Sequence, residues 1–242
     1  SDEALEFEAK EELLNFLNDW LNDHIYEQLN DLINLVKLEN KNKYLRALSF
    51  QLYENNGVLK RGDVEEIVKA ITKEERRQFK NLGIKIGRYH IFLPKMLKPK
   101  AVNLRILLWK FFNNISNANE IPKSGLNFLI DEKKQFNKKF LLLCGFEKFD
   151  HFYIRVDILE KFFIKIIENT RNGKFKINSE MMNLLGCSKE NFFKLMSLMN
   201  YKKDNNNLDV YSYKGYRKEK IKVRFNNKKD NPFKKLMYLN LK

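Results

Sequence analysis

The sequence predicts a mainly α-helical protein with small β elements, an α+β fold in which a helical array precedes a winged-helix-like half with a C-terminal β-hairpin. Three observations lead to this prediction. Apolar residues recur at steps of three and four along most of the chain, and capping residues and glycines divide it into short segments. Strand-like runs bounded by Gly, Pro or Asn lie near 84–93, 146–156 and 208–225. With 242 residues, 43% of them hydrophobic, the chain can bury one sizeable core or two small ones.

A compact helical array is expected in the first half. Within 1–40, an apolar stripe opposite acidic residues predicts one long helix. Thr72 and Glu75 have the spacing of a capping box, and Pro99 suits the first turn of a helix. The expected elements are helices within 1–40, at 43–55, 63–70, 72–83 and from Pro99 onward, and one or two short strands at 84–93 that end at Pro94. The buried side of the last helix is expected to comprise Val102, Leu104, Leu107, Leu108, Phe111 and Phe112.

The second half is divided more clearly by capping and turn residues. The expected elements are a helix at 136–143, a hairpin at 146–156 turning near 148–150, a helix capped by Asp157 with Glu160, helices capped by Ser179 and Ser188, and strands at 208–213 and 218–225. Gly186-Cys187-Ser188 joins two of these helices with helix-turn-helix spacing. Three helices followed by a β-hairpin make the plan of a winged helix.

A linker is expected near 115–125, where the chain is rich in Asn and Ser. It would separate a helical domain, 1–115, with its short β segment near 84–93, from a winged-helix-like domain, 126–242, with a basic hairpin and tail. This boundary predicts two domains of similar size.

Charge is distributed unevenly. Residues 1–40 contain 11 acidic and two basic residues, whereas the remaining residues contain 44 basic and 20 acidic ones, a net charge of +24 within a total of +15. An excess of this kind favours a polyanionic partner. The acidic helix is either a solvated face or a surface that docks on basic protein.

Several classes of protein are excluded or disfavoured. No apolar run approaches 18 residues, which argues against a membrane span, and the acidic N-terminal stretch is unlike a secretory signal. Cys144 and Cys187 are too far apart for a CxxC zinc site, and His24, His90 and His151 are scattered. We therefore expect a soluble cytoplasmic protein with no metal site.

Motifs for catalysis are absent from the sequence. Gly173-Lys174 is followed by Phe175, so the chain has no Walker A loop, and Asp131-Glu132 does not belong to a DExH box. A Cys–His pair that meets only in space is the remaining route to a nucleophile. The chain by itself is predicted to be inactive, with no catalytic residue and no cofactor.

Three basic clusters are the candidate nucleic-acid-binding residues. The first comprises Arg88, Lys95, Lys98, Lys100 and Arg105, where Tyr89 or His90 could stack on a base. The second comprises Lys189, Lys194, Lys202 and Lys203, on and after the predicted recognition helix. The third comprises Lys214, Arg217, Lys218, Lys220, Lys222 and Arg224, interleaved with Tyr211, Tyr213 and Tyr216. The alternatives are solvated lysines over a core for the first, a protein-binding winged helix for the second and a charged edge hairpin for the third.

Several segments resemble a known family. They are LSFQLYENNGVLKR (48–61), GRYHIFLPKMLKPKAVNLRILLW (87–109), YIRVDILEKF (153–162), MMNLLGCSKENF (181–192) and NPFKKLMYL (231–239). These segments are similar to the C-terminal region of bacterial superfamily 2 helicases related to the mitochondrial-degradosome RNA helicase.

The resemblance implies an accessory region of a larger machine. In that family two RecA-like motor domains precede this region and bind ATP and Mg²⁺, so no catalytic residue carries over to this chain. The region after the motors packs on them and helps to enclose the translocating strand, and a nuclease is a further candidate partner.

The function predicted from these observations is therefore that of a C-terminal accessory region of an ATP-dependent RNA or DNA helicase. It would bind single-stranded RNA or DNA by charge and stacking, without reading sequence. The alternative is a protein-interaction scaffold whose basic face docks acidic partners.

Overall fold

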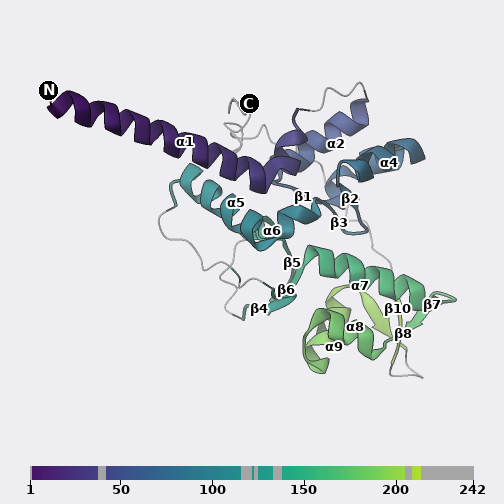
Figure 1. The fold of residues 1–242 in the computed structure, drawn as a ribbon. Helices are drawn as coiled ribbons and strands as arrows, with labels where there is room; N and C mark the ends of the chain where they lie inside the picture. The colour runs from purple at the N-terminus through teal and green to yellow at the C-terminus, as the bar shows by residue number, and fades with distance from the viewer. Residues whose placement is uncertain are drawn as a thin grey trace.

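The computed structural model describes residues 2–37, 42–115, 122, 125–132, 138–204 and 209–213. This part of the chain is mainly helical, with three small antiparallel sheets (Figure 1). The first half contains α1 (Asp2–Asn34), α2 (Lys43–Glu54), β1 (Val58–Lys60), η1 (Arg61–Val64), α3 (Glu65–Ala70), α4 (Lys73–Asn81), β2 (Lys85–Ile86), β3 (His90–Phe92), η2 (Pro94–Leu97) and α5 (Pro99–Phe112).

The remaining elements belong to the second half. They are β4 (Phe128–Ile130), α6 (Lys138–Leu143), β5 (Phe146–Phe149), β6 (Phe152–Arg155), α7 (Val156–Asn169), β7 (Thr170–Arg171), β8 (Lys174–Lys176), α8 (Ser179–Leu185), α9 (Lys189–Leu198), β9 (Tyr201–Lys203) and β10 (Val210–Tyr213). The strand orders are β1-β3-β2, β4-β6-β5 and β7-β8-β10-β9.

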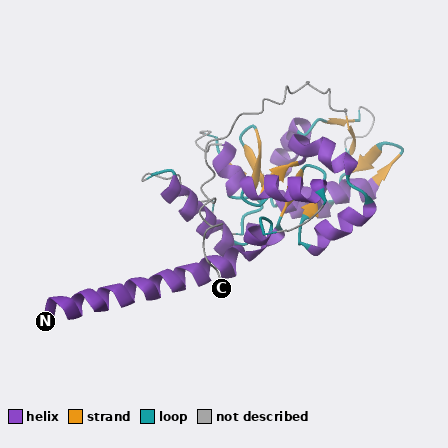
Figure 2. Ribbon diagram, turned by 90° about the horizontal axis from the view of Figure 1, so that it is seen from above, coloured by secondary structure: helices purple, strands orange, loops and turns teal. Residues whose placement is uncertain are grey.

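The core of the first half forms around the C-terminal third of α1. Ile25, Leu29 and Leu32 of this helix are buried among side chains of α2, α4 and the β1-β3-β2 sheet. The rest of α1 extends away from the body of the molecule, as the two views show (Figures 1 and 2).

The predicted linker does not separate the hydrophobic clusters into two independent sets. Val102 and Ile106 of α5 pack in one cluster with Phe140 of α6 and Tyr153 of β6. A second, smaller cluster joins Val58 and Phe92 to Val156 at the start of α7. Residues on both sides of the predicted boundary thus share buried apolar contacts.

Local signals set many of the element ends as predicted. The capping box of Thr72 and Glu75 is present at the start of α4, and Pro99 is the first residue of α5. Gly186 ends α8 in the left-handed conformation, with φ of 68°, and Ser188 caps α9. These features depend on neighbouring residues only, so the sequence predicts them well.

Several caps and faces differ from the prediction. Asp157 does not cap α7: the helix begins at Val156, and Asp157 pairs with Arg155. Asn178, not Ser179, caps α8, because its side-chain oxygen accepts the N–H of Met181.

The face that α5 buries is also shifted. Leu107 and Phe111 are exposed, whereas Arg105 and Ile106 are buried. The reason is that α6 and β6 pack against the side of α5 that carries Ile106. Strand β1, which the sequence did not predict, pairs with β3.

The C-terminal hairpin pairs differently from the prediction. Strand β10 corresponds to the predicted strand at 208–213, but its neighbours are β8 on one edge and β9 on the other. The predicted pairing of 208–213 with 218–225 is therefore wrong, because both edges of β10 are occupied. The segment 218–225 itself lies outside the described residues.

None of the helices in the part of the chain described here is both long enough and apolar enough to cross a membrane.

Candidate functional site

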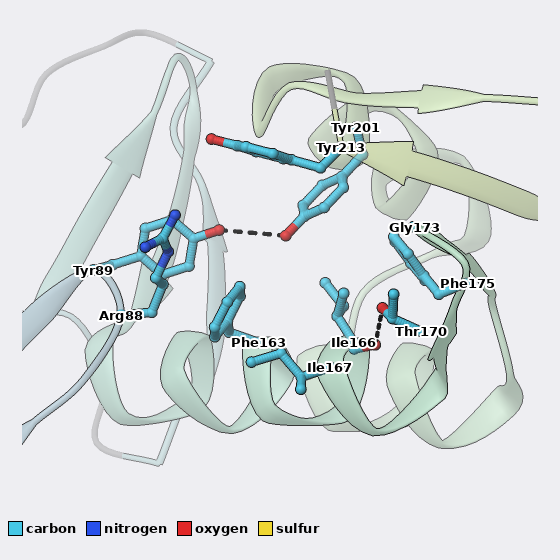
Figure 3. Close-up of a pocket in the computed structure, with 10 residues that line it drawn as sticks. All are labelled: Arg88, Tyr89, Phe163, Ile166, Ile167, Thr170, Gly173, Phe175, Tyr201 and Tyr213. Carbon is cyan, nitrogen blue, oxygen red and sulfur yellow. Dashed lines mark hydrogen bonds between the residues drawn. The ribbon is translucent and has the colours of Figure 1, made fainter. Parts of the chain in front are cut away.

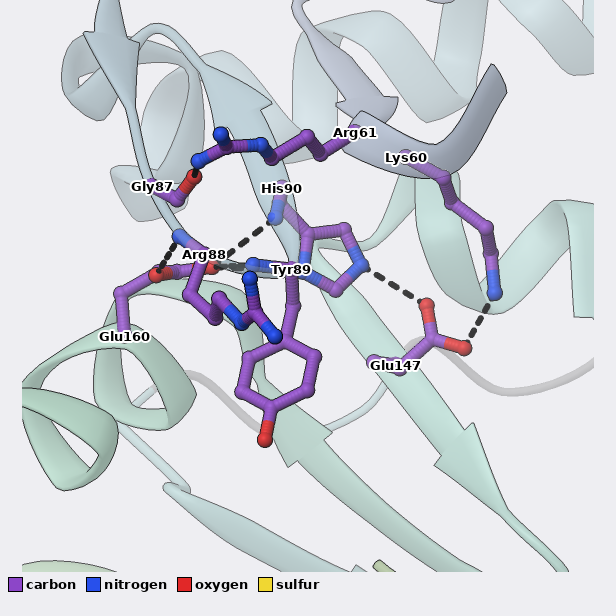
Figure 4. Close-up of polar contacts among 8 residues, drawn as sticks. All are labelled: Lys60, Arg61, Gly87, Arg88, Tyr89, His90, Glu147 and Glu160. Carbon is purple, nitrogen blue, oxygen red and sulfur yellow. Dashed lines mark hydrogen bonds and ion pairs between the residues drawn. The ribbon is translucent and has the colours of Figure 1, made fainter. Parts of the chain in front are cut away.

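A carboxylate from the second half of the chain holds the turn between β2 and β3 (Figure 4). Glu160 of α7 accepts hydrogen bonds from three consecutive backbone N–H groups, those of Arg88 at 2.6 Å, Tyr89 at 2.7 Å and His90 at 2.8 Å. Gly87 allows this approach, because an added Cβ would lie 2.3 Å from the Glu160 carboxyl carbon. Three charge-assisted hydrogen bonds fix the backbone, and with it the starting directions of the Arg88 and Tyr89 side chains.

His90 extends this attachment into a buried ionic network. Its Nε2 lies 2.8 Å from Oε2 of Glu147 on β5, and its Nδ1 lies 3.8 Å from Oε1 of Glu160. Lys60 of β1 pairs with the other oxygen of Glu147. Because these four side chains come from β1, β3, β5 and α7, the network ties the two halves of the chain together.

The network sets the charge of its own members. Burial alone would lower the pKa of His90, but the hydrogen bond that its ring donates to Glu147 and the negative charges of Glu147 and Glu160 outweigh burial and raise this pKa. Burial alone would raise the pKa values of the two glutamates, but hydrogen bonds from His90 and, at Glu160, from the backbone amides lower both. Both carboxylates are therefore ionised at neutral pH, as buried charges with close partners must be.

A pocket of about 250 Å³ lies beside this turn, against α7 and the four-stranded sheet (Figure 3). Most of its wall is aromatic or aliphatic. The lining residues are Arg88, Tyr89, Phe163, Ile166, Ile167, Thr170, Gly173, Phe175, Tyr201 and Tyr213.

The aromatic rings that line the pocket contact one another. Tyr89 meets Phe163 edge-on, with ring centroids 5.6 Å apart, and its hydroxyl lies 3.4 Å from the hydroxyl of Tyr201. The ring of Tyr201 in turn lies 5.4 Å from that of Tyr213, which is 40% exposed. The Arg88 guanidinium sits over the Phe163 ring at 5.7 Å. The pocket thus has rigid aromatic walls and one exposed ring.

The chemistry of the lining restricts what could bind. Burial raises the pKa values of Tyr89 and Tyr201, so both phenols are neutral at neutral pH. The lining contains no carboxylate, and its one charged side chain is Arg88. A cavity just below the usual size for small-molecule sites suits a single planar ring system, and Arg88 favours an anionic group next to that ring.

Two further guanidinium groups lie near Arg88. Burial and the charges of Arg88 and Arg76 lower the pKa of Arg61. Arg61 donates a hydrogen bond of 2.8 Å to the carbonyl of Gly87, and Arg76 donates one of 3.0 Å to the carbonyl of Val68. The charges of Glu160 and Glu65 act on Arg61 in the opposite direction, so the three guanidinium groups are partly balanced by carboxylates.

The structure leaves most of the predicted basic residues at the surface. The exposed ones are Arg88, Lys95, Lys98, Lys100, Lys189, Lys194, Lys202 and Lys203. Two of them form ion pairs that offset the local positive charge: Lys95 with Asp31 and Lys194 with Glu190, both at 2.8 Å. Of the predicted basic residues and stacking rings, Arg88, Tyr89 and Tyr213 line the pocket.

Two predictions for the first cluster are wrong. Arg105 is 0% exposed, and its guanidinium donates to the backbone carbonyls of Asn56 and Met96. Burial lowers its pKa to about 10. Arg105 therefore joins two segments of the core and does not reach a phosphate. His90 is 1% exposed and occupied by the ionic network, so it does not stack on an external base.

The second cluster is only partly brought together. Lys189 of α9 and Lys203 of β9 lie over the same ring, that of Phe193, at 5.8 Å and 5.4 Å. The Phe193 ring stacks in turn on Tyr211, with an angle of 11° between the planes. These side chains make a small basic and aromatic patch on the second half.

Most of the third cluster lies outside the described residues. This applies to Lys214, Tyr216, Arg217, Lys218, Lys220, Lys222 and Arg224. Of that cluster, the structure places Tyr213, which is exposed, and Tyr211, which is 3% exposed and packs against Phe193.

Sequence reasoning missed most of the pocket. Phe163, Ile166 and Ile167 belong to an apolar stripe of α7 that the helical period predicts to be core, and Ile167 is instead 56% exposed. Phe175 and Tyr201 come from strands that the sequence did not predict. No local pattern distinguishes a ring in a pocket wall from a ring in a core.

The two cysteines and the candidate metal ligands are the remaining chemical groups of interest in the sequence. Burial raises the pKa of Cys144 to about 12 and that of Cys187 to about 11, so both remain protonated at neutral pH. Among the described residues, no group of three His, Cys, Asp or Glu side chains is placed to hold a metal ion.

Comparison of the chain with protein-family models, with curated proteins and with solved structures finds no match.

Proposed function

We propose that this chain binds single-stranded nucleic acid without reading its sequence. The aromatic pocket beside Arg88 is the observation that carries the proposal. Bases of single strands stack on aromatic rings while basic side chains contact phosphates, and the pocket offers both within one site. Its mostly apolar, carboxylate-free wall suits a base, and the exposed guanidinium of Arg88 suits the adjoining phosphate.

The arrangement of the second half supports the same proposal. Its elements follow the order α7, β8, α8, α9, β9 and β10, with strands arranged β8-β10-β9. This order fits a winged-helix-like unit with one added edge strand, β7. The patch of Lys189, Lys203 and Phe193 would then extend the binding surface beyond the pocket.

The resemblance of 87–109 and the other quoted segments extends the proposal to a larger machine. The chain would be the accessory region of an ATP-dependent helicase, packing on motor domains of the same polypeptide and guiding the strand past them. Phosphate contacts supply such guidance, because they carry affinity but no sequence information.

Fluorescence anisotropy with a labelled oligo-uridine tests the proposal directly. Log affinity is expected to fall with log salt, and Arg88→Glu is expected to reduce the slope by about 0.7 or more, the effect of one lost contact to a single strand. Tyr213→Ala, at an exposed ring, is expected to weaken binding about tenfold, the range for one lost base stack.

Lys139→Glu is the matched control. Lys139 is an exposed base on α6 that does not line the pocket, so its reversal should have a smaller effect than that of Arg88→Glu. Absence of oligonucleotide binding at low salt would contradict the proposal and favour a scaffold that docks acidic proteins. Equal effects of the two charge reversals would contradict the assignment to the pocket.

A further inference from the structure

The projecting part of α1 exposes an unusual amount of apolar surface. Between residues 7 and 24, seven large apolar side chains are each 42% exposed or more. They are Phe7, Leu13, Leu14, Phe16, Leu17, Trp20 and Leu21. Further along the same helix, Leu29 and Leu32 are 0% exposed. The apolar stripe therefore continues past the point at which α1 leaves the body (Figure 2).

This surface is one face of the helix. At 3.6 residues per turn, all of these side chains except Phe16 fall within a sector of about 140°, and the acidic side chains of the segment lie outside that sector. The six side chains on this face together expose on the order of 600 Å² of apolar surface, about three quarters of the ~800 Å² that each partner contributes to a standard interface. Patches of this size on soluble proteins mark interaction sites. No other element of the described residues covers this part of α1, and an isolated helix is only marginally stable in water.

The spacing indicates that the partner is another helix. Phe7, Leu14 and Leu21 are seven residues apart, and the intermediate heptad positions of the segment are Lys10, Leu17 and His24, of which Leu17 at the centre is apolar. In this frame Glu11 is the one acidic side chain of the segment that flanks the seam, meaning the line of contact between two paired helices. The other acidic side chains of 7–24 lie at outer positions of the heptad. The acidic residues therefore neither repel a second copy of the same helix nor select a basic partner.

We propose that the 7–24 segment of α1 pairs with the same segment of a second copy of this chain, in antiparallel orientation. Each helix carries a basic body at its C-terminal end, so antiparallel pairing keeps the two bodies at opposite ends of the pair. Pairing about the centre of the exposed segment places Leu14 opposite Leu17 of the second copy. Such a contact is isologous and closes as a dimer.

Sedimentation of the full chain over a range of concentrations up to about 100 µM tests this pairing. The wild-type chain is expected to reach twice its mass of 29.1 kDa. Leu17→Glu, which places a charge in the seam, is expected to weaken dimerisation at least tenfold. Asn15→Glu adds the same charge on the acidic face and should leave the dimer unchanged. Circular dichroism checks that both variants keep the fold, since the substituted side chains are exposed.

A charge-swap mixture tests the orientation. Leu17→Glu and Leu14→Lys should each be monomeric alone. Mixing the two variants should restore a dimer, because antiparallel pairing sets the introduced carboxylate of one chain against the introduced ammonium of the other. A wild-type monomer at all concentrations would overturn the proposal and leave this face to another part of the same polypeptide or to a different protein. A dimer that survives Leu17→Glu, or a mixture that stays monomeric, would also overturn it.

Discussion

The ionic network behind the pocket and the projecting part of α1 invert the usual distribution of side chains in opposite ways. Around His90, charged groups are buried, and each has a partner from a distant part of the chain. Along α1, large apolar groups are exposed and meet no element of the described structure that would cover them. The first inversion is resolved within the molecule, so it explains how the fold is held. The second is not resolved among the described residues, and the pairing proposed above is one way to cover it.

The two regions should therefore respond differently to substitution. Changes in the network are expected to act on stability and, through Arg88 and Tyr89, on the pocket. Changes along 7–24 are expected to act on assembly and to leave the stability of the body unchanged.

Glu160→Ala should have the largest effect on stability. The substitution leaves three backbone N–H groups without their acceptor and removes the carboxylate that lies 3.8 Å from Nδ1 of the buried His90 ring, and breaking a buried charged network in this way costs about 3–5 kcal/mol. Chemical denaturation measures the loss. Glu168→Ala removes an exposed glutamate from the same helix and should stay within about 0.5 kcal/mol of the wild type. Similar costs for the two variants would mean that Glu160 does not anchor the turn.

Leu29→Ala and Leu14→Ala compare the same change in the two parts of α1. Leu29 is 0% exposed and lies in the core, so its truncation should cost about 2–4 kcal/mol of unfolding free energy. Leu14 is 59% exposed, so its truncation should cost under about 0.5 kcal/mol for the monomeric protein while weakening the dimer. The measurement is denaturation at low protein concentration. A large loss with Leu14→Ala under those conditions would show that this side chain is covered by the chain's own body.

The pH dependence of stability should show the smallest effect. The pKa of His90 is higher in the folded chain than the ~6.5 of an unfolded chain, so its stabilisation is fully present below that value and is lost as pH rises through the folded pKa. The pKa values of Glu147 and Glu160 are lowered, so their stabilisation is present above ~4.3 and is lost as pH falls through the folded values. Stability from the network should therefore be greatest between about 4.3 and 6.5.

His90→Gln should remove the decline on the alkaline side. Denaturation midpoints measured across this range, for the variant and the wild type, check the expectation. A wild-type curve that rises between about 6.5 and 8 would contradict it, because the opposite sign requires a lowered histidine pKa.

The features that could be predicted from the sequence are local ones. The capping box at Thr72, the proline that opens α5 and the glycine that ends α8 depend on residues a few positions apart, so their patterns predicted real element ends. The mainly helical α+β class follows from these segments, as does the amphipathic character of α1.

Which groups meet, in contrast, is a property of the folded chain. Glu160 has the spacing of a helix-capping residue in the sequence, yet its partners are amides about 70 positions earlier. Arg105 belongs to a basic cluster in the sequence, yet its guanidinium is buried against two carbonyls. The apolar stripe of α1 is continuous in the sequence and covered along only part of its length. Periodicity specifies the direction in which a side chain leaves its own element, whereas burial and charge pairing depend on what another element places there.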